Sequence, residues 1–306
     1  MLDAHQLNVF LAAAETLSFT QAAQRTHMSQ PSVSQHIQTL ERIFGVPLFL
    51  RSGRNLELSD AALTLIPLAR EMVALSNRIE ETMACLVGNV SGHLHVACST
   101  TPGRYILPNL LASFYRLHPL VRATCSVYSQ SQSLSLLQDG LTHFALASEP
   151  ENVYPELEFS HFLRDEICLL VPASHPWVEQ PEIDAQELCQ ADLIMREEGS
   201  GTYTAVLRTL AENDISSKQL HVLLTLGNSE AIALSVQQGL GVGFVSKVVF
   251  YRLGLRDVVP IQVKGLSFSR DIFIARNKRR VATSAQSIFW EFVTRQKDLF
   301  LKEFLG

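Results

Sequence analysis

The chain has 306 residues, of which 47% are hydrophobic and 18% are charged, and its formal net charge is −5. At about 100–200 residues per domain, this length predicts two or three domains with a buried core. The near-average globular composition excludes a disordered tail, a collagen-like chain and a coiled-coil rod. No apolar run approaches the roughly 18–20 residues that span a bilayer. The first residues also lack the basic and apolar regions of a signal peptide, so we expect a cytoplasmic protein without a membrane partner.

Residues 5–58 begin with a helix-turn-helix pattern. Ser18 and Ser29 each stand where a helix N-cap is expected, and Pro31 falls in the first turn of the second helix, where a missing N–H costs nothing. On that helix Val33, Ile37 and Leu40 share one face, which we expect to be buried. The opposite face carries Pro31, Ser32, Gln35, Gln38 and Thr39, with Ser34 near its edge.

This polar face is suited to base edges, because a glutamine amide can make a bidentate contact to adenine in the major groove. The alternative is an ordinary solvated helix in a helical bundle. Residues 45–58 predict two short strands around a tight turn, beside which Arg51 and Arg54 are candidate phosphate or minor-groove contacts. Surface ion pairs are the alternative for these two arginines. Residues 1–58 hold four Arg and four acids, so affinity for DNA must come from focused contacts and from pairing of two copies.

Residues 59–88 predict one long amphipathic helix, with Pro67 near a bend at its start. An apolar seam follows it at steps of three and four residues: Leu68, Met72, Leu75, Ile79, Met83 and Leu86. Such a seam is typical of a dimerising linker helix. A core helix without a partner chain is the alternative.

The rest of the chain alternates short apolar strands with helices. The predicted strands are residues 94–98, 123–127, 144–147, 167–171, 193–195 and 242–245. Strands alternating with helices imply parallel sheets, whose ligands bind at the carboxyl ends of the strands. The domain boundaries are therefore placed at 1–58, 59–90 and 91–306.

The five cysteines are Cys85, Cys98, Cys125, Cys168 and Cys189. Their odd number and wide spacing indicate neither a disulfide framework nor a zinc site, and we expect buried small side chains. A redox-sensing pair is the alternative, but the surroundings of Cys189 lack the basic groups that activate a thiol. No metal and no cofactor are expected.

Two other classes of protein fit the composition. An enzyme is disfavoured because the phosphate-loop, zinc-protease and hydrolase motifs are absent, and the glycines at 239–243 are too closely spaced for a dinucleotide fingerprint. A solute-binding receptor would need export and would not need residues 5–86.

The sequence resembles the LysR-type transcriptional regulators. The segments that match their winged helix-turn-helix in order and spacing are residues 10–14, 18–23, 29–34, 37–41, 48–49 and 51–54. Further matches lie at residues 107–108, 118–121, 196–202 and 232–246. In this alignment Gln30, Pro31, Ser34 and Gln35 match DNA contacts, and Arg54 matches a wing residue that reaches the minor groove.

The resemblance implies a winged helix-turn-helix, a linker helix and a two-lobed α/β effector domain similar to periplasmic binding proteins. Lobe I would be about 91–161 and 267–306, and lobe II about 162–266. The family usually forms a homotetramer, as a dimer of dimers. Polar residues that follow the strands would then face one cleft: Ser99, Thr100, Thr101, Arg104, Ser131, Thr202 and Asn228.

Hydroxyl groups at a helix start, where N–H groups and the helix dipole favour negative charge, predict a small anionic effector. Ordinary N-capping is the alternative for each of these residues taken alone. The sequence therefore predicts a DNA-binding transcriptional regulator that responds to a small metabolite, with double-stranded DNA and a second copy of the chain as partners.

Overall fold

The computed structural model describes residues 2–52, 55–86, 89–148 and 154–295. The chain divides into two compact units, residues 1–89 and 90–306.

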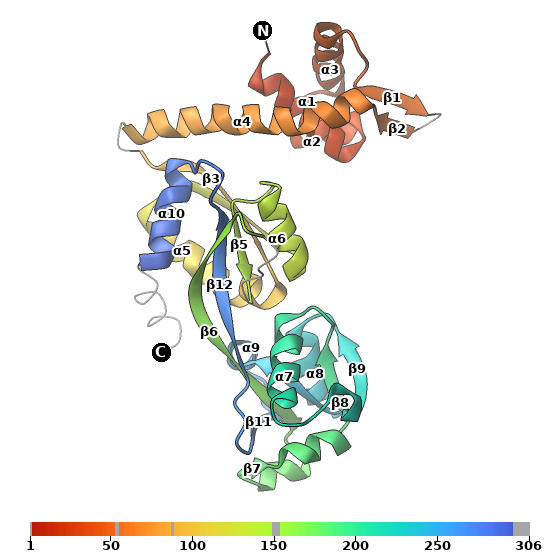
Figure 1. Cartoon of the computed structure of the whole chain (residues 1–306), viewed down its shortest axis with the longest axis vertical. Coiled ribbons are helices and arrows are strands. Elements are labelled where there is room, and N and C mark those ends of the chain that lie inside the picture. Colours follow the sequence, from red (N-terminus) through yellow and green to blue (C-terminus); the bar gives the residue numbers. More distant parts are fainter. Residues whose placement is uncertain (1, 53–54, 87–88, 149–153, 296–306) are drawn as a thin grey trace. The chain divides into compact units, whose positions relative to one another are not determined.

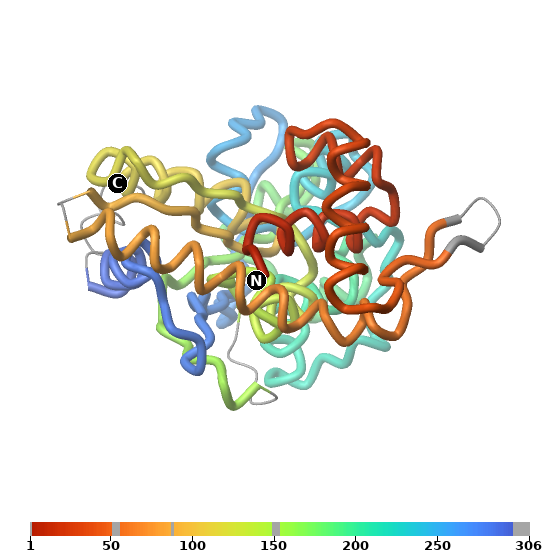
Figure 2. Tube along the Cα trace, turned by 90° about the horizontal axis from the view of Figure 1, so that it is seen from above, coloured from red at the N-terminus to blue at the C-terminus, as the bar shows by residue number. Residues whose placement is uncertain are grey.

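The first unit consists of four helices and a two-stranded hairpin (Figure 1). Its elements are α1 (Ala4–Thr16), α2 (Phe19–Arg25), α3 (Gln30–Phe44), β1 (Phe49–Ser52), β2 (Asn55–Leu58) and α4 (Asp60–Leu86). Helix α1 packs against α2, α3 and α4, while the hairpin extends away from these helices (Figure 2).

Local sequence explains where these helices begin and which face they bury. The Ser18 hydroxyl accepts a hydrogen bond from the Gln21 N–H, and Ser29 accepts one from Ser32, so both predicted N-caps are confirmed. The buried residues of α3 are Val33, Ile37 and Leu40, as predicted.

The linker helix α4 differs from its prediction at one residue. It continues through Pro67, where a bend was expected. Proline removes only one helical hydrogen bond, the one from residue 67 to the carbonyl of residue 63. The rest of the 27-residue helix remains bonded on both sides of this gap.

The second unit is built on one ten-stranded sheet, in the order β4-β3-β5-β12-β6-β10-β8-β9, with β11 paired to β6 and β7 paired to β11. Its strands are β3 (Ser91–Cys98), β4 (Leu120–Val127), β5 (Phe144–Ala147), β6 (Leu157–Pro172), β7 (Glu182–Ile183), β8 (Leu193–Arg196), β9 (Val222–Leu226), β10 (Val242–Ser246), β11 (Val258–Val263) and β12 (Ser269–Asn277). Its α-helices are α5 (Leu107–Leu117), α6 (Gln130–Gln138), α7 (Gly201–Ala211), α8 (Ser229–Gln237), α9 (Lys247–Leu253) and α10 (Ser284–Arg295). Short helical turns η1 (Pro102–Ile106), η2 (Pro176–Glu179), η3 (Ala185–Gln190) and η4 (Ser217–Gln219) complete it.

Two lobes share this sheet, and the antiparallel strands β6 and β12 run through both of them (Figure 1). The hydrophobic core of lobe I includes Leu163 and Ile272, whereas that of lobe II includes Ile167 and Phe268. The strand pair therefore passes from the core of lobe I to the core of lobe II within β6 and next to the start of β12. No flexible loop separates the lobes at these points.

Five strands differ from the prediction. The predicted strand 167–171 is only the second half of the 16-residue β6, and β7, β9, β11 and β12 were not predicted. Asp165 and Glu166 interrupt the apolar pattern of β6, while β9 is a largely exposed edge strand. Periodicity detects strands whose apolar residues form one face. In these segments, charged or exposed residues interrupt that apolar pattern.

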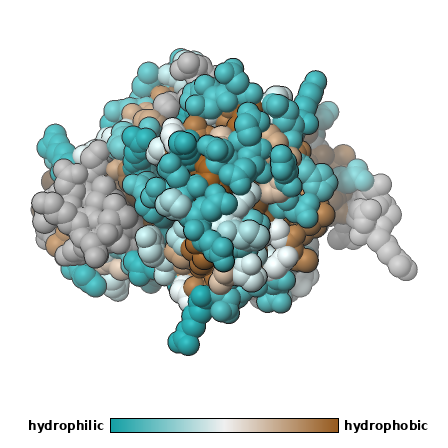
Figure 3. All heavy atoms as spheres, turned by 90° about the horizontal axis from the view of Figure 1, so that it is seen from below, coloured by the Kyte–Doolittle hydropathy of each residue, from teal (hydrophilic) through white to brown (hydrophobic). Residues whose placement is uncertain are grey.

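The surface of the molecule is mainly hydrophilic where Figure 3 shows it, with apolar residues in small separate areas. Among the described residues, none of the helices combines the length and apolarity that crossing a bilayer requires.

A buried ion pair joins the two long strands. Arg270 on β12 lies 2.8 Å from the Asp165 carboxylate on β6, and the exposed fractions of these residues are 3% and 1%. Asp165 also accepts a hydrogen bond of 2.5 Å from the Ser246 hydroxyl. The pair thus fixes the register of the strands where the two lobes meet.

We expect Arg270→Met to lower the free energy of unfolding of the second unit by about 3–5 kcal/mol, because it leaves an unpaired buried carboxylate. Lys247→Met, which removes the exposed pair of Lys247 with Glu166, should cost at most about 1 kcal/mol. Urea unfolding of both variants measures the difference. Equal losses would contradict the role of the buried pair.

Candidate functional site

The polar face of α3 is free to meet another molecule. Gln30, Pro31, Gln35 and Gln38 are exposed, and Ser32, Ser34 and Thr39 are half-buried. Within the described part of the chain, the side-chain amides of Gln30, Gln35 and Gln38 make no hydrogen bond. Three unpaired amides on one exposed helix face are available to bond base edges.

Two of the predicted contact residues already have internal partners. The Ser32 hydroxyl lies 2.8 Å from the Ser29 hydroxyl, and the Thr39 hydroxyl donates to the Gln35 carbonyl at 2.8 Å. Both hydroxyls keep further hydrogen-bonding capacity, but the amides are the stronger candidates for reading bases.

The hairpin beside α3 is present as predicted. Strands β1 and β2 pair antiparallel, with Ser52 opposite Asn55. Arg51 lies on β1, but its side chain is not described, and Arg54 lies outside the described residues. Glu41 of α3 accepts hydrogen bonds from the N–H groups of Leu48 (2.8 Å) and Phe49 (3.3 Å), and so ties the hairpin to α3. Sequence analysis did not assign this role to Glu41.

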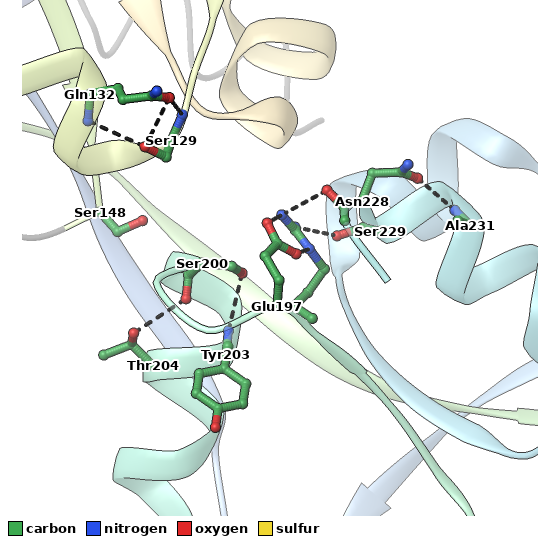
Figure 4. Close-up of polar contacts among 12 residues, drawn as sticks. Ser129, Gln132, Ser148, Glu197, Ser200, Tyr203, Thr204, Asn228, Ser229 and Ala231 are labelled. Atoms are coloured by element: carbon green, nitrogen blue, oxygen red, sulfur yellow. Dashed lines mark hydrogen bonds and ion pairs between the residues drawn. The ribbon is translucent and has the colours of Figure 1, made fainter. Parts of the chain in front are cut away.

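In the second unit, the carboxyl ends of four parallel strands lead into helices. Strand β3 leads to η1 and α5, β4 to α6, β8 to α7 and β9 to α8. Ser129, Ser200 and Asn228 cap α6, α7 and α8 with their side chains. In Figure 4 these caps surround the same region between the two lobes. Three helix N-termini directed to one region create a positive potential there.

Two of the predicted effector residues have hydroxyl groups without a partner. Thr101 and Thr202 are 2% and 1% exposed, and neither Oγ1 has a hydrogen-bond partner. A buried hydroxyl that lacks a partner costs roughly 1–3 kcal/mol. These two groups therefore indicate a site that a ligand would complete.

The other predicted effector residues are arranged differently. Ser99 and Thr100 are half-buried, and Ser131 is exposed, with its hydroxyl 3.2 Å from that of Ser129. Asn228 accepts a hydrogen bond from the Ala231 N–H at 2.7 Å, so its side-chain oxygen serves as the N-cap of α8.

Arg104 joins the two lobes. Its guanidinium lies 2.7 Å from the carboxylate of Glu230 at the start of α8, and this hydrogen bond raises the pKa of Arg104. Burial, together with the Glu230 carboxylate, raises the pKa of the adjacent Tyr105 to about 12. One acidic residue of lobe II is thus held by the first helical turn of lobe I.

A second contact between the lobes lies at the start of α7. A Cβ atom added to Gly201 would lie 1.9 Å from the Ser148 hydroxyl oxygen at the end of β5. Ser148 in turn accepts a 3.5 Å hydrogen bond from Arg270. Only glycine allows α7 to approach β5 this closely.

Arg196 is a site residue that sequence analysis did not identify. It is 5% exposed, donates two 2.8 Å hydrogen bonds to Glu197, and also contacts the Ser229 hydroxyl and the Gly227 carbonyl. It therefore holds the turn between β9 and α8. A charged residue at the end of an apolar strand was the available signal.

The charges of this region are balanced. Arg104, Arg196 and Arg270 each pair with an acidic residue. Attraction for an anion must therefore come from the helix N-termini and the hydroxyl groups. In the described part of the chain, no group of three or more His, Cys, Asp or Glu residues is arranged to hold a metal ion. A surface pocket lined by Leu207, Ala211 and Ile215 lies at the other end of α7 and is not part of this region.

Comparison with known proteins covers both units. A family model described as the LysR substrate binding domain matches residues 88–298, and one described as the bacterial regulatory helix-turn-helix protein, lysR family, matches residues 4–63. The transcriptional activator CmpR of Synechocystis sp. is 30% identical over 294 residues, covering 94% of each chain.

Two solved structures share the fold. Full-length CbnR in complex with its target DNA has a TM-score of 0.67 at 22% identity, covering 97% of this chain and 100% of that chain. The regulatory domain of Synechocystis CcmR in complex with 2-PG has a TM-score of 0.61 at 24% identity, covering 68% of this chain and 98% of that chain. The chain therefore belongs to the LysR family of DNA-binding transcriptional regulators, with an N-terminal helix-turn-helix followed by a two-lobed effector domain.

Proposed function

We propose that α3 reads operator DNA through its exposed amides, and that a small anionic metabolite binds between the lobes and controls this activity. The two partnerless hydroxyls of Thr101 and Thr202 are the observation that carries the effector site. Binding to chromosomal DNA would place the protein in the cytoplasm. The DNA complex of CbnR and the 2-PG complex of CcmR support the two classes of ligand.

The ligand is expected to act through the lobes. A ligand that binds one arrangement of the lobes more tightly shifts the population toward that arrangement. The contact of Arg104 with Glu230 and the contact of Gly201 with Ser148 both join the lobes, so their geometry would change with lobe closure. We expect this shift between lobe arrangements to change how the paired DNA-binding domains contact their operator.

We also propose that α4 pairs with α4 of a second copy. Five of its seam residues are exposed by 45–75%: Leu68, Leu75, Ile79, Met83 and Leu86. An apolar stripe of this spacing is stabilised by a second helix. Pairing would also supply the second DNA-binding domain that a unit without surplus positive charge needs. A dimer of such dimers is the assembly that the family resemblance implies.

The first prediction concerns base reading. Gln35→Ala should lose roughly 1–3 kcal/mol of discrimination at one base-pair position, because a bidentate amide contact is removed. Gln24→Ala, the same change on an exposed residue of α2, should leave the base preference unchanged. Selection of randomised DNA with each variant provides the comparison. Equal losses of Gln35→Ala on operator and random DNA would refute base reading.

The second prediction concerns the effector site. Thr202→Val should weaken effector binding about tenfold or more, since a hydrogen bond to a charged group is worth roughly 1.5–3 kcal/mol. The variant should not be less stable, because the hydroxyl it removes has no partner in the protein.

Thr142→Val is the matched control. Thr142 also has a buried hydroxyl without a partner, but it precedes β5 at the opposite end of that strand from Ser148. Calorimetric titration with 2-PG and a panel of small carboxylates and phosphates measures both variants. Unchanged affinity in Thr202→Val would place the ligand elsewhere.

The third prediction concerns assembly. Ile79→Glu should weaken the dimer by roughly 1.5–3 kcal/mol or more, because it removes a large apolar side chain from the seam and introduces a charge. Leu63→Glu, at a comparably exposed position of α4 that lies off the seam, should not. Analytical ultracentrifugation measures the dissociation constants. Loss of assembly in both variants, or in neither, would argue against the seam.

A further inference from the structure

Two cysteine sulfurs lie in contact in lobe I. Strands β3 and β4 pair in parallel, with Val96 opposite Cys125 and Cys98 opposite Val127. Because residues two apart on a strand point to the same face, Cys98 and Cys125 share one face of the sheet. Their Sγ atoms are 3.4 Å apart. Cys85, Cys168 and Cys189, which also lie in the described part of the chain, make no sulfur–sulfur contact there.

The two thiols differ in their surroundings. Cys98 is fully buried, whereas Cys125 is exposed. A hydrogen bond from Cys98 lowers the pKa of the Cys125 thiol, while the same hydrogen bond and burial raise the pKa of Cys98. An accessible thiol with thiolate character is the group that oxidants attack, and a second thiol beside it can resolve the product.

The absence of a side chain at Gly103 in turn η1 leaves space for these two sulfurs. A Cβ atom added to Gly103 of η1 would lie 2.7 Å from the Cys98 sulfur and 3.9 Å from the Cys125 sulfur. Any larger residue at position 103 would displace the buried thiol. The contact therefore depends on a glycine two residues after Thr101, a candidate effector residue.

We propose that Cys98 and Cys125 form a reversible redox site that hydrogen peroxide converts to an intramolecular disulfide. The Cys125 thiol loses its proton, the thiolate attacks one peroxide oxygen, and the O–O bond breaks. The displaced hydroxide takes up that proton, so the products are a sulfenic acid and water. The Cys98 sulfur then attacks the Cys125 sulfur, so the S–S bond forms, the S–O bond breaks, and the Cys98 proton leaves with the hydroxide as a second water. Two thiols and one peroxide thus give one disulfide and two waters. A small-molecule thiol reverses the step through a mixed disulfide.

Oxidation must move the end of β3. A disulfide bond is about 2.05 Å long, so the sulfurs must approach by more than 1 Å from their 3.4 Å separation. The two residues are two positions out of register across the parallel strand pair. With a rise of about 3.3 Å per residue and about 4.8 Å between strands, their Cα atoms lie roughly 8 Å apart. Beyond about 7 Å a disulfide needs backbone movement, so the backbone has to shift. Cys98 is followed directly by Ser99 and by the helical turn that holds Thr101. Any effect of this shift on effector binding rests on the proposed function. Formation of the disulfide does not depend on that function.

The test uses the full-length protein treated with hydrogen peroxide, then unfolded for thiol counting and peptide mapping. Of the five cysteines, two should be lost from the thiol count, with a Cys98–Cys125 peptide cross-link that dithiothreitol reverses. Cys125→Ser, a change at an exposed position, should form no such cross-link. Cys189→Ser, which keeps the pair, should form it at the wild-type rate. Circular dichroism checks that both variants are folded.

Hydrogen exchange of residues 99–106 in the oxidised and reduced protein provides a second readout, and the rates should differ. Three results would overturn the proposal: no loss of thiols, a sulfinic acid at Cys125 without a cross-link, or a disulfide through Cys125 between two chains. Each of these is independent of whether an effector binds between the lobes.

Discussion

The antiparallel pairing of β6 with β12 is the constraint on which the effector domain depends. These two strands carry residues of both lobe cores, and the buried pair of Asp165 with Arg270 fixes them where the cores meet. Because a buried charge without its partner is strongly unfavourable, the register of the strands cannot slip. The buried pair therefore keeps the two lobes connected in one strand register where their cores meet.

Parallel strands on both sides of this junction determine where the chemistry lies. Each parallel strand leads into a helix, so helix N-termini gather at the strand ends. The caps Ser129, Ser200 and Asn228 use their own side chains to satisfy backbone groups. Among the candidate effector residues, Thr101 and Thr202 have buried hydroxyls without a partner, and these hydroxyls are available to a ligand. The arginines of the region position its segments, since each is paired with an acid.

Much of this arrangement could be predicted from the sequence, because local rules decide it. The caps Ser18 and Ser29, the buried stripe of α3 and strand β5 all follow from the periodicity and end signals of neighbouring residues. Resemblance to the LysR family added the two lobes, which no local pattern could supply.

The missed features depend on partners far away in the chain. Asp165 interrupts β6 in the sequence but is buried because Arg270, over a hundred residues later, neutralises it. Cys98 and Cys125 carry no sequence motif, and only the register of β3 with β4 brings their sulfurs together. Arg196 likewise acts on Gly227, in the turn after β9, and on Ser229, the first residue of α8.

In the proposed mechanism, one chain reads a specific DNA site, and a small anion between its lobes controls this reading. Selection of genomic DNA fragments with the purified full-length protein, followed by footprinting with and without 2-PG and related small anions, tests it most directly. We expect enrichment of a dyad site, as two paired readers require, with a footprint whose length changes when an anion binds. Failure to enrich any site, or a footprint unchanged by every anion that binds the protein, would contradict it.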